Sequence, residues 1–317
     1  MGVPQPRILP REIPQANVES KRRTSGQAWI IGIFLLPGAI VYTLFLIWPI
    51  VQAVYYSLFN WNGLGPVANF VGTGNYTRIF NDAVFHQSII HTLFIVTLSL
   101  TIQLPLALIL AVMIGRKLPG RMFFRIIFFL PYVFSEVVTA IIFSFVYTPD
   151  GGVANTILKT IIPGFQAQAW LGNRDIALLA IFAVITWKYF GLHMILYMAA
   201  LQQVPPEIEE AARIDGAREF QVLRYVTFPS MGTTIRLTIY LSVVGSLNQF
   251  VLTWILTTGG PANATHVLAT YMYRFGPLAF KYGYGTAVAV IIFTASLVFS
   301  LLYQRFVMRQ DYEGEVN

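Results

Sequence analysis

The sequence is dominated by long stretches without any charged side chain. Four of them contain no Asp, Glu, Lys or Arg: residues 24–77, 83–115, 237–273 and 282–304. Two more contain a single charge each, Glu136 within 126–149 and Lys188 within 176–206. Each stretch can hold the roughly 20 apolar residues that a membrane-spanning helix needs. Only 11% of the 317 residues are charged, too few to coat a soluble protein of this size.

These stretches predict an all-α integral membrane protein with six transmembrane helices, at about 28–50, 88–114, 122–147, 176–200, 232–256 and 284–307. Their apolar residues run all the way round each segment rather than alternating, which disfavours a β-barrel. The predicted domain is a six-helix transmembrane region, 28–308. A basic tail, 1–27, precedes it and a short tail, 309–317, follows it.

The positive charges predict the orientation. Fifteen Lys and Arg lie in the two tails and near the even-numbered loops, and five lie in the opposite loops. Cytoplasmic loops carry this excess, so both termini are predicted to be cytoplasmic. The net charge of +7 then sits at the surface of membrane lipid, and no nucleic acid needs to be invoked.

The sequence contains no pattern that predicts an enzyme active site. The chain has no Cys, which excludes disulfides, thiolate metal sites and a Cys nucleophile. Its four His are scattered along the sequence and form no metal-ligand spacing. We therefore predict no catalytic residue and no metal site, and a membrane-embedded enzyme is disfavoured.

The fourth loop, residues 204–231, is the longest cytoplasmic connection and reads VPPEIEEAARIDGAREFQVLRYVTFPSM. Its prolines suit a helix start, its glutamates suit the first turns, and Gly216 suits the helix end. A second short helix should follow, stopped by Pro229. A membrane-surface helix would be basic on its polar face, whereas this first half is acidic. The pattern favours docking to another protein.

Within this loop, Glu210-Ala211-Ala212, then Asp215-Gly216-Ala217, then Pro229 resemble the EAA loop of permease subunits of binding-protein-dependent ABC importers. Further segments resemble the carbohydrate-uptake branch, which includes sugar and glycerol-3-phosphate importer permeases and the larger maltose permease subunit. Examples are Tyr56–Trp61, Leu130-Pro131 and Thr258–Pro261. The resemblance covers about residues 28–308 and implies the type I importer permease fold.

The resemblance also implies the partners. They are a second homologous permease subunit, two copies of a cytoplasmic ATPase, and an extracytoplasmic solute-binding protein that delivers a carbohydrate. The chain contains no Gly-Lys pair, so it has no P-loop. It is expected to hold no cofactor, because ATP and Mg would be bound by the ATPase. In the family this loop contacts the ATPase, which implies coupling roles for Glu210, Ala211, Ala212, Asp215 and Gly216.

Polar residues inside the fifth predicted span are candidates for the solute path. Ser242, Ser246 and Gln249 fall at i, i+4 and i+7 on one helical face. Gly245 and Asn248 adjoin this stripe, and a resemblance to the sugar-contacting stretch of the maltose permease favours the same role. The alternative is helix–helix hydrogen bonding with small-residue packing.

The fourth span adds Tyr189, which by resemblance aligns with a sugar-contacting segment. Lys188 in this span and Glu136 in the third are the two charges deep within spans. Each would be costly alone, so we predict that they form an ion pair, with a proton relay as the alternative. The alternative function is a stand-alone secondary transporter or channel for a small polar solute, which would work through Glu136 and Lys188.

Overall fold

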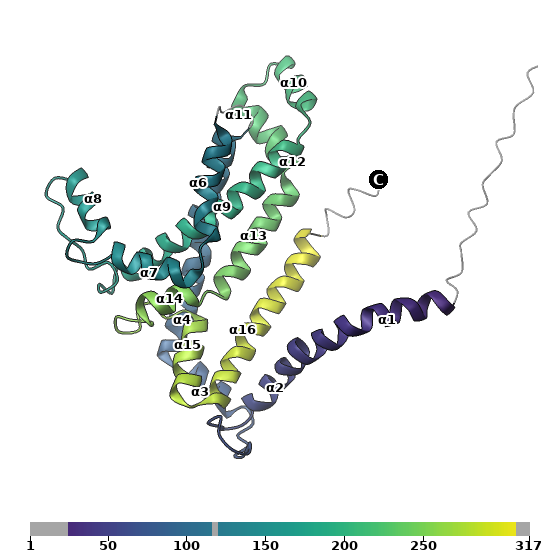
Figure 1. Ribbon diagram of the computed structural model, residues 1–317, viewed down its shortest axis with the longest axis vertical. Coiled ribbons are helices and arrows are strands. Elements are labelled where there is room, and N and C mark those ends of the chain that lie inside the picture. The colour runs from purple at the N-terminus through teal and green to yellow at the C-terminus, as the bar shows by residue number, and fades with distance from the viewer. Residues whose placement is uncertain (1–24, 116–119, 309–317) are drawn as a thin grey trace, which may run out of the picture. The chain divides into compact units, whose positions relative to one another are not determined.

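The computed structural model is built of helices (Figure 1) and describes residues 25–115 and 120–308. Nearly all of the two predicted tails lies outside these residues. The described α-helices are α1 Ser25–Tyr42, α2 Trp48–Ser57, α3 Gly74–Phe80, α4 Ala83–Leu98, α5 Leu104–Ile114, α6 Arg121–Val133, α7 Glu136–Val146, α8 Val153–Ile161, α9 Ala177–Gln203, α10 Pro206–Ile214, α11 Glu219–Val222, α12 Phe228–Ser230, α13 Gly232–Leu247, α14 Val251–Thr257, α15 Leu268–Phe275 and α16 Tyr282–Tyr303.

Two compact units divide the chain. One ends at Ile50 and contains α1, and the other begins at Val51 and contains every helix from α3 onward. Single-turn π-helices join consecutive α-helices within spans, for example at Ser99–Gln103 between α4 and α5. No β-strand occurs among residues 25–115 and 120–308, where a lone bridge pairs Phe59 with Phe70.

Four predicted spans are continuous helical segments long and apolar enough to cross a membrane: Ile31–Ser57, Ala83–Ile114, Ala177–Gln203 and Tyr282–Met308. Each segment overlaps one predicted span, and its ends differ from the predicted ends by up to several residues. The spans predicted at 122–147 and 232–256 are each a pair of helices bent at a break, by 99° between α6 and α7 and by 41° between α13 and α14. Counting each bent pair as one span gives the six predicted spans among the described residues.

The α6–α7 break has identifiable local causes. Pro131 lies within the last turn of α6 and lacks the amide hydrogen that would bond to the carbonyl of Ile127, which weakens the end of this helix. Phe134 and Ser135 are extended, and the Ser135 hydroxyl caps α7 by accepting a hydrogen bond from the amide of Val138 at 3.2 Å. A capped new start gives α7 a direction of its own.

Helix α9 is the centre of the second unit. Its first half packs with α7 and α14 around Ile181, Val184 and Leu252, which are fully buried. Its second half packs with α5 around Met194 and Ala107. A burial of this extent explains why the helix is apolar all round, since neighbouring helices cover most of its faces.

Gly191 lets α6 approach α9 closely. A side chain at this position would collide with the backbone carbonyl of Phe128 on α6. Small residues at helix crossings allow such close backbone contact in membrane proteins. This crossing fixes the end of α6, and with it the α6–α7 break, against the middle of α9.

Candidate functional site

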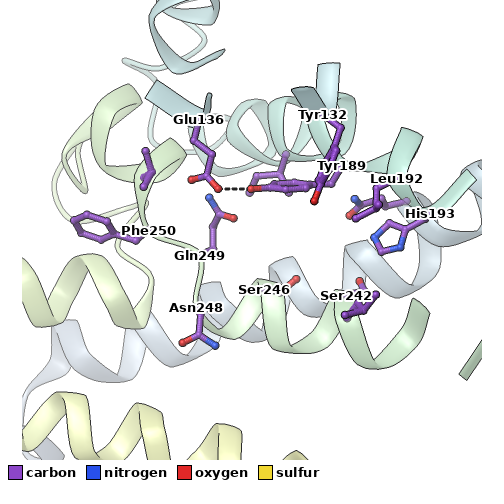
Figure 2. A pocket seen from close by; sticks show the side chains of 15 residues that line it. Tyr132, Glu136, Tyr189, Leu192, His193, Ser242, Ser246, Asn248, Gln249 and Phe250 are labelled. Carbon is purple, nitrogen blue, oxygen red and sulfur yellow. Dashed lines mark hydrogen bonds between the residues drawn. The ribbon is translucent and has the colours of Figure 1, made fainter. Parts of the chain in front are cut away.

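A cavity of about 390 Å³ lies in the second unit, beside the two helix breaks (Figure 2). Helices α6, α7, α9, α13 and α14 contribute to its walls. It is lined by Gln103, Tyr132, Glu136, Ile185, Tyr189, Leu192, His193, Leu241, Ser242, Gly245, Ser246, Asn248, Gln249, Phe250 and Val251.

All six residues predicted for the solute path line this one cavity: Tyr189, Ser242, Gly245, Ser246, Asn248 and Gln249. The hydroxyl of Ser246 lies 3.3 Å from that of Ser99, and the side-chain amide of Asn248 donates to the backbone carbonyl of Val244 at 2.9 Å. The structure thus brings the six together, while their contact with a solute stays a prediction.

The reason given for Gln249 was partly wrong. Its spacing from Ser242 assumed one continuous helix, but α13 ends at Leu247 and Gln249 lies in the break before α14. Figure 2 shows its side chain reaching from this break toward Glu136. The break, rather than helical periodicity, directs Gln249 into the cavity.

Three buried polar atoms of the lining have no hydrogen-bond partner among the described residues. They are Nδ1 of His193, Oγ of Ser242 and Nε2 of Gln249. These residues are 4–6% exposed. Because an unpaired buried polar group is costly, such groups need a ligand or water as partner. A cavity with several unpaired hydrogen-bonding groups is suited to a polyhydroxylated solute.

Aromatic rings complete the lining. Tyr132 and Tyr189 lie with ring centroids 6.2 Å apart, and Phe250 stacks on Trp254 at 6.0 Å. Tyr132, Phe250 and Gln103 were not singled out in the sequence. Gln103 could have been, because an uncharged polar side chain in the middle of an apolar span is a pathway signal. Tyr132 and Phe250 carried no such signal.

The predicted ion pair between Glu136 and Lys188 is wrong. Within the described part of the chain, no ion pair within 4.0 Å joins them. The Tyr189 hydroxyl donates to Glu136, while Lys188 Nζ donates to the carbonyl of Phe134 and, at 3.4 Å, to that of Tyr132. Both carbonyls lie where α6 ends. The helix break therefore supplies partners that the sequence could not reveal.

The second candidate site is the loop between α9 and α13. Helix α10 begins at Pro206, as expected, and Gly216 follows it with φ of +87°, a conformation that favours glycine. The second helical run continues from α11 through a π-turn into α12 and ends at Ser230, one residue after Pro229, with the turn at Met231. The stop therefore falls beside Pro229, as predicted.

The residues predicted to couple to a partner present an open surface. Glu210, Ala211, Asp215 and Gly216 are exposed, and Ala212 is half-buried. Two large apolar side chains of the same loop are also exposed, Ile214 at 86% and Phe220 at 71%. An exposed group of large apolar side chains rimmed by polar residues is typical of a protein interaction site.

The interior of the loop is fixed by Glu209, the glutamate beside Glu210. Glu209 is buried and accepts a hydrogen bond from the Thr227 hydroxyl at 2.9 Å. Arg213 lies 3.8 Å from Glu209 and donates to both carboxylate oxygens of Glu219, at 2.9 and 3.2 Å. These bonds to Glu219 raise the pKa of Arg213, so its guanidinium stays charged. The network ties α10 to the second half of the loop.

The family comparison covers both sites. Residues 103–312 match the family described as binding-protein-dependent transport system inner membrane component. The chain belongs to this family. The match spans more than half of the sequence, and it establishes a multi-pass inner-membrane protein of a transport system that depends on a binding protein.

Curated relatives of known or assigned role match over most of their length. A probable ABC transporter permease of Bacillus subtilis, YurN, is 35% identical over 86% of this chain and 94% of its own. The lactose transport permease LacF of Rhizobium radiobacter is 35% identical over 89% and 95%. The diacetylchitobiose uptake permease NgcF of Streptomyces coelicolor is 30% identical over 83% and 77%.

A solved structure has the same fold. A chain of the bacterial alginate ABC transporter, in complex with a periplasmic protein that holds an alginate pentasaccharide, matches with a TM-score of 0.78 and 25% identity. The match covers 90% of this chain and 96% of that one. The all-helical importer permease fold predicted from the sequence is thereby confirmed.

Proposed function

We propose that this chain is the permease subunit of an ATP-driven ABC importer and passes a carbohydrate through the cavity beside the two helix breaks. The observation that carries the proposal is the lining itself. Unpaired hydrogen-bonding atoms of His193, Ser242 and Gln249 line the same cavity as the rings of Tyr132 and Tyr189. Hydroxyl groups need such donors and acceptors, and sugar ring faces stack on aromatic rings.

The relatives support a carbohydrate over other small polar solutes. Permeases for lactose and for diacetylchitobiose are among them, and the solved transporter imports an acidic polysaccharide. The solute would reach the outer face on an extracytoplasmic binding protein and leave the cavity to the cytoplasm. Weak contacts spread over many groups suit this role, because the solute has to leave again.

The partners follow from the loop between α9 and α13. We place two copies of a cytoplasmic ATPase and a second, homologous permease in the complex. Glu210 would make a polar contact with one ATPase copy, Ala211 and Ala212 would allow close approach, and Gly216 with Asp215 would form the turn. ATP and Mg would be bound by the ATPase, and this chain would hold no cofactor.

Gly245 offers a direct test of the path. It lines the cavity, and a Cβ atom built on it meets no atom within 4 Å. Gly245→Phe should therefore fill the cavity without disturbing the backbone. We expect ATP-dependent uptake of lactose or diacetylchitobiose into proteoliposomes holding the assembled importer to fall by at least about tenfold, equivalent to about 1.4 kcal/mol. Whichever of these sugars the wild-type complex takes up serves as the probe.

Thr233→Phe, an exposed position on the same helix that does not line the cavity, is the matched control and should keep its uptake. Normal uptake by Gly245→Phe would contradict the path. Ion-driven uptake by vesicles that hold this chain alone would instead support the stand-alone transporter.

A further inference from the structure

We propose that this cavity admits uncharged sugars and rejects anionic ones, such as phosphate esters, uronic acids and sulfonates. The inference rests on the proposed function, because it concerns the solute of the same cavity. Relatedness alone leaves the question open. The relatives include a lactose permease and a sulfoquinovosyl glycerol permease, and the solved transporter imports the acidic polysaccharide alginate.

The first argument is the charge of the lining. Glu136 is the one Asp, Glu, Lys or Arg among the residues that line the cavity. Figure 2 shows its carboxylate among the lining side chains, held by the Tyr189 hydroxyl. An anionic solute would meet this carboxylate inside the cavity, where repulsion between like charges is stronger than in bulk water. A hydroxyl group, in contrast, could donate a hydrogen bond to it.

The second argument concerns the nearest cation, Lys188. Lys188 is 3% exposed and does not line this cavity, but it lines a neighbouring pocket that shares Tyr132, Glu136 and Tyr189 with it. Its ammonium group is already bonded to the carbonyls of Phe134 and Tyr132. Recognition of phosphate, carboxylate or sulfonate relies on Arg or Lys donors directed at the ligand. Lys188 is committed to the end of α6 and does not supply one.

The other titratable groups of the lining are Tyr132, Tyr189 and His193. None of these is an Asp, Glu, Lys or Arg, so the formal charge of the lining is that of Glu136. At pH 8 the field inside the cavity should therefore be that of Glu136, reduced by the more distant Lys188.

The natural absence of cysteine makes this field measurable. Gly245→Cys places one thiol in the cavity, with space for its side chain. In the assembled importer at pH 8, its reaction rates with a cationic trimethylammonium and an anionic sulfonate methanethiosulfonate are compared. The cationic-to-anionic rate ratio is divided by the same ratio for Thr160→Cys, an exposed position on α8 outside the cavity. We expect the cavity thiol to favour the cationic reagent by about tenfold, as a nearby unit charge predicts.

Adding Glu136→Gln should abolish or reverse this preference, because Lys188 then remains as the nearest charge. Glu136→Asp should keep it. A neutral methanethiosulfonate measures access in every variant and reveals one that misfolds. If the neutral reagent reaches the cavity thiol but the thiol shows no preference between the charged reagents, or prefers the anionic one, the charge inference is wrong and the solute path is unaffected. A cavity thiol that the neutral reagent never reaches would overturn both this inference and the proposed solute path.

Discussion

Two neighbouring glutamates, Glu209 and Glu210, have opposite surroundings and should have opposite roles. Glu209 is buried and bonded to Thr227, whereas Glu210 is exposed beside Ala211. The sequence predicted Glu210 as the important one, on resemblance, and gave Glu209 only a place in the first helical turns. The side-chain partner of Glu209 comes from 18 residues further along the chain, which no local pattern reveals.

Glu209→Ala should loosen the loop between α9 and α13. Loss of a buried hydrogen-bonded carboxylate costs about 1–3 kcal/mol, so trypsin should cut at Arg213 or Arg218 about tenfold faster in membranes. Glu210→Ala is the matched control: in membranes that hold this chain without the ATPase, both variants are digested and Glu210→Ala should leave the cleavage rate unchanged, whereas in the assembled complex less ATPase should co-purify with it. Equal cleavage rates in the two variants would contradict the internal role of Glu209.

Residue patterns predicted the residues that line the cavity better than they predicted the partners of the two charges within spans. Ser242, Gly245, Ser246 and Asn248 were found because polar and small residues stand out in an apolar span. The pairing of Glu136 with Lys188 failed, because pairing was inferred from cost alone. The exposed carbonyls at the end of α6 offered Lys188 partners that are invisible in a sequence.

At the scale of elements, the two broken spans are the features that create the cavity. The α6–α7 break places Tyr132 and Glu136 in its wall, and the α13–α14 break adds Asn248, Gln249 and Phe250. Non-helical backbone at membrane depth is tolerated only where protein or a water-filled cavity satisfies it. Here Ser135 caps the new helix and Lys188 takes two of the carbonyls.

Lys188→Met tests the role of that side chain at the break. Methionine keeps the length of the side chain but leaves the carbonyls of Tyr132 and Phe134 without their donor, at a cost of about 1–3 kcal/mol. We expect the thermal midpoint of the detergent-solubilised complex to fall by about 5 °C. Lys159→Met, at an exposed site on α8, should leave it unchanged. An unchanged or raised midpoint for Lys188→Met would mean that burying the charge costs more than its bonds return.

At the scale of the whole molecule, the distribution of Lys and Arg predicts which loops lie on the cytoplasmic side of the membrane. The rule places α8 outside and the loop that contains α10 inside. The same orientation is needed for the proposed function, since ATP is cytoplasmic and the binding protein is not.

Single cysteines on the cysteine-free chain test this orientation. In right-side-out membrane vesicles, an impermeant maleimide should label Thr160→Cys on α8 and leave Ile214→Cys unlabelled. Ile214→Cys should react once the membrane is dissolved in denaturing detergent, which also removes any partner that covers it. Labelling of Ile214→Cys in sealed vesicles would reverse the orientation and contradict the coupling role of the loop.

The sequence by itself determined the membrane class, the positions of the six spans and the helical character of the loop for which a partner is proposed. These follow from local quantities, since hydropathy adds up along a segment and helix-start and helix-end residues act on their own neighbours. Only the tertiary structure decided where two spans break and which polar groups share a cavity. Lys188 meets carbonyls 54 and 56 residues away, and contacts between segments so far apart exist only once the helices have packed.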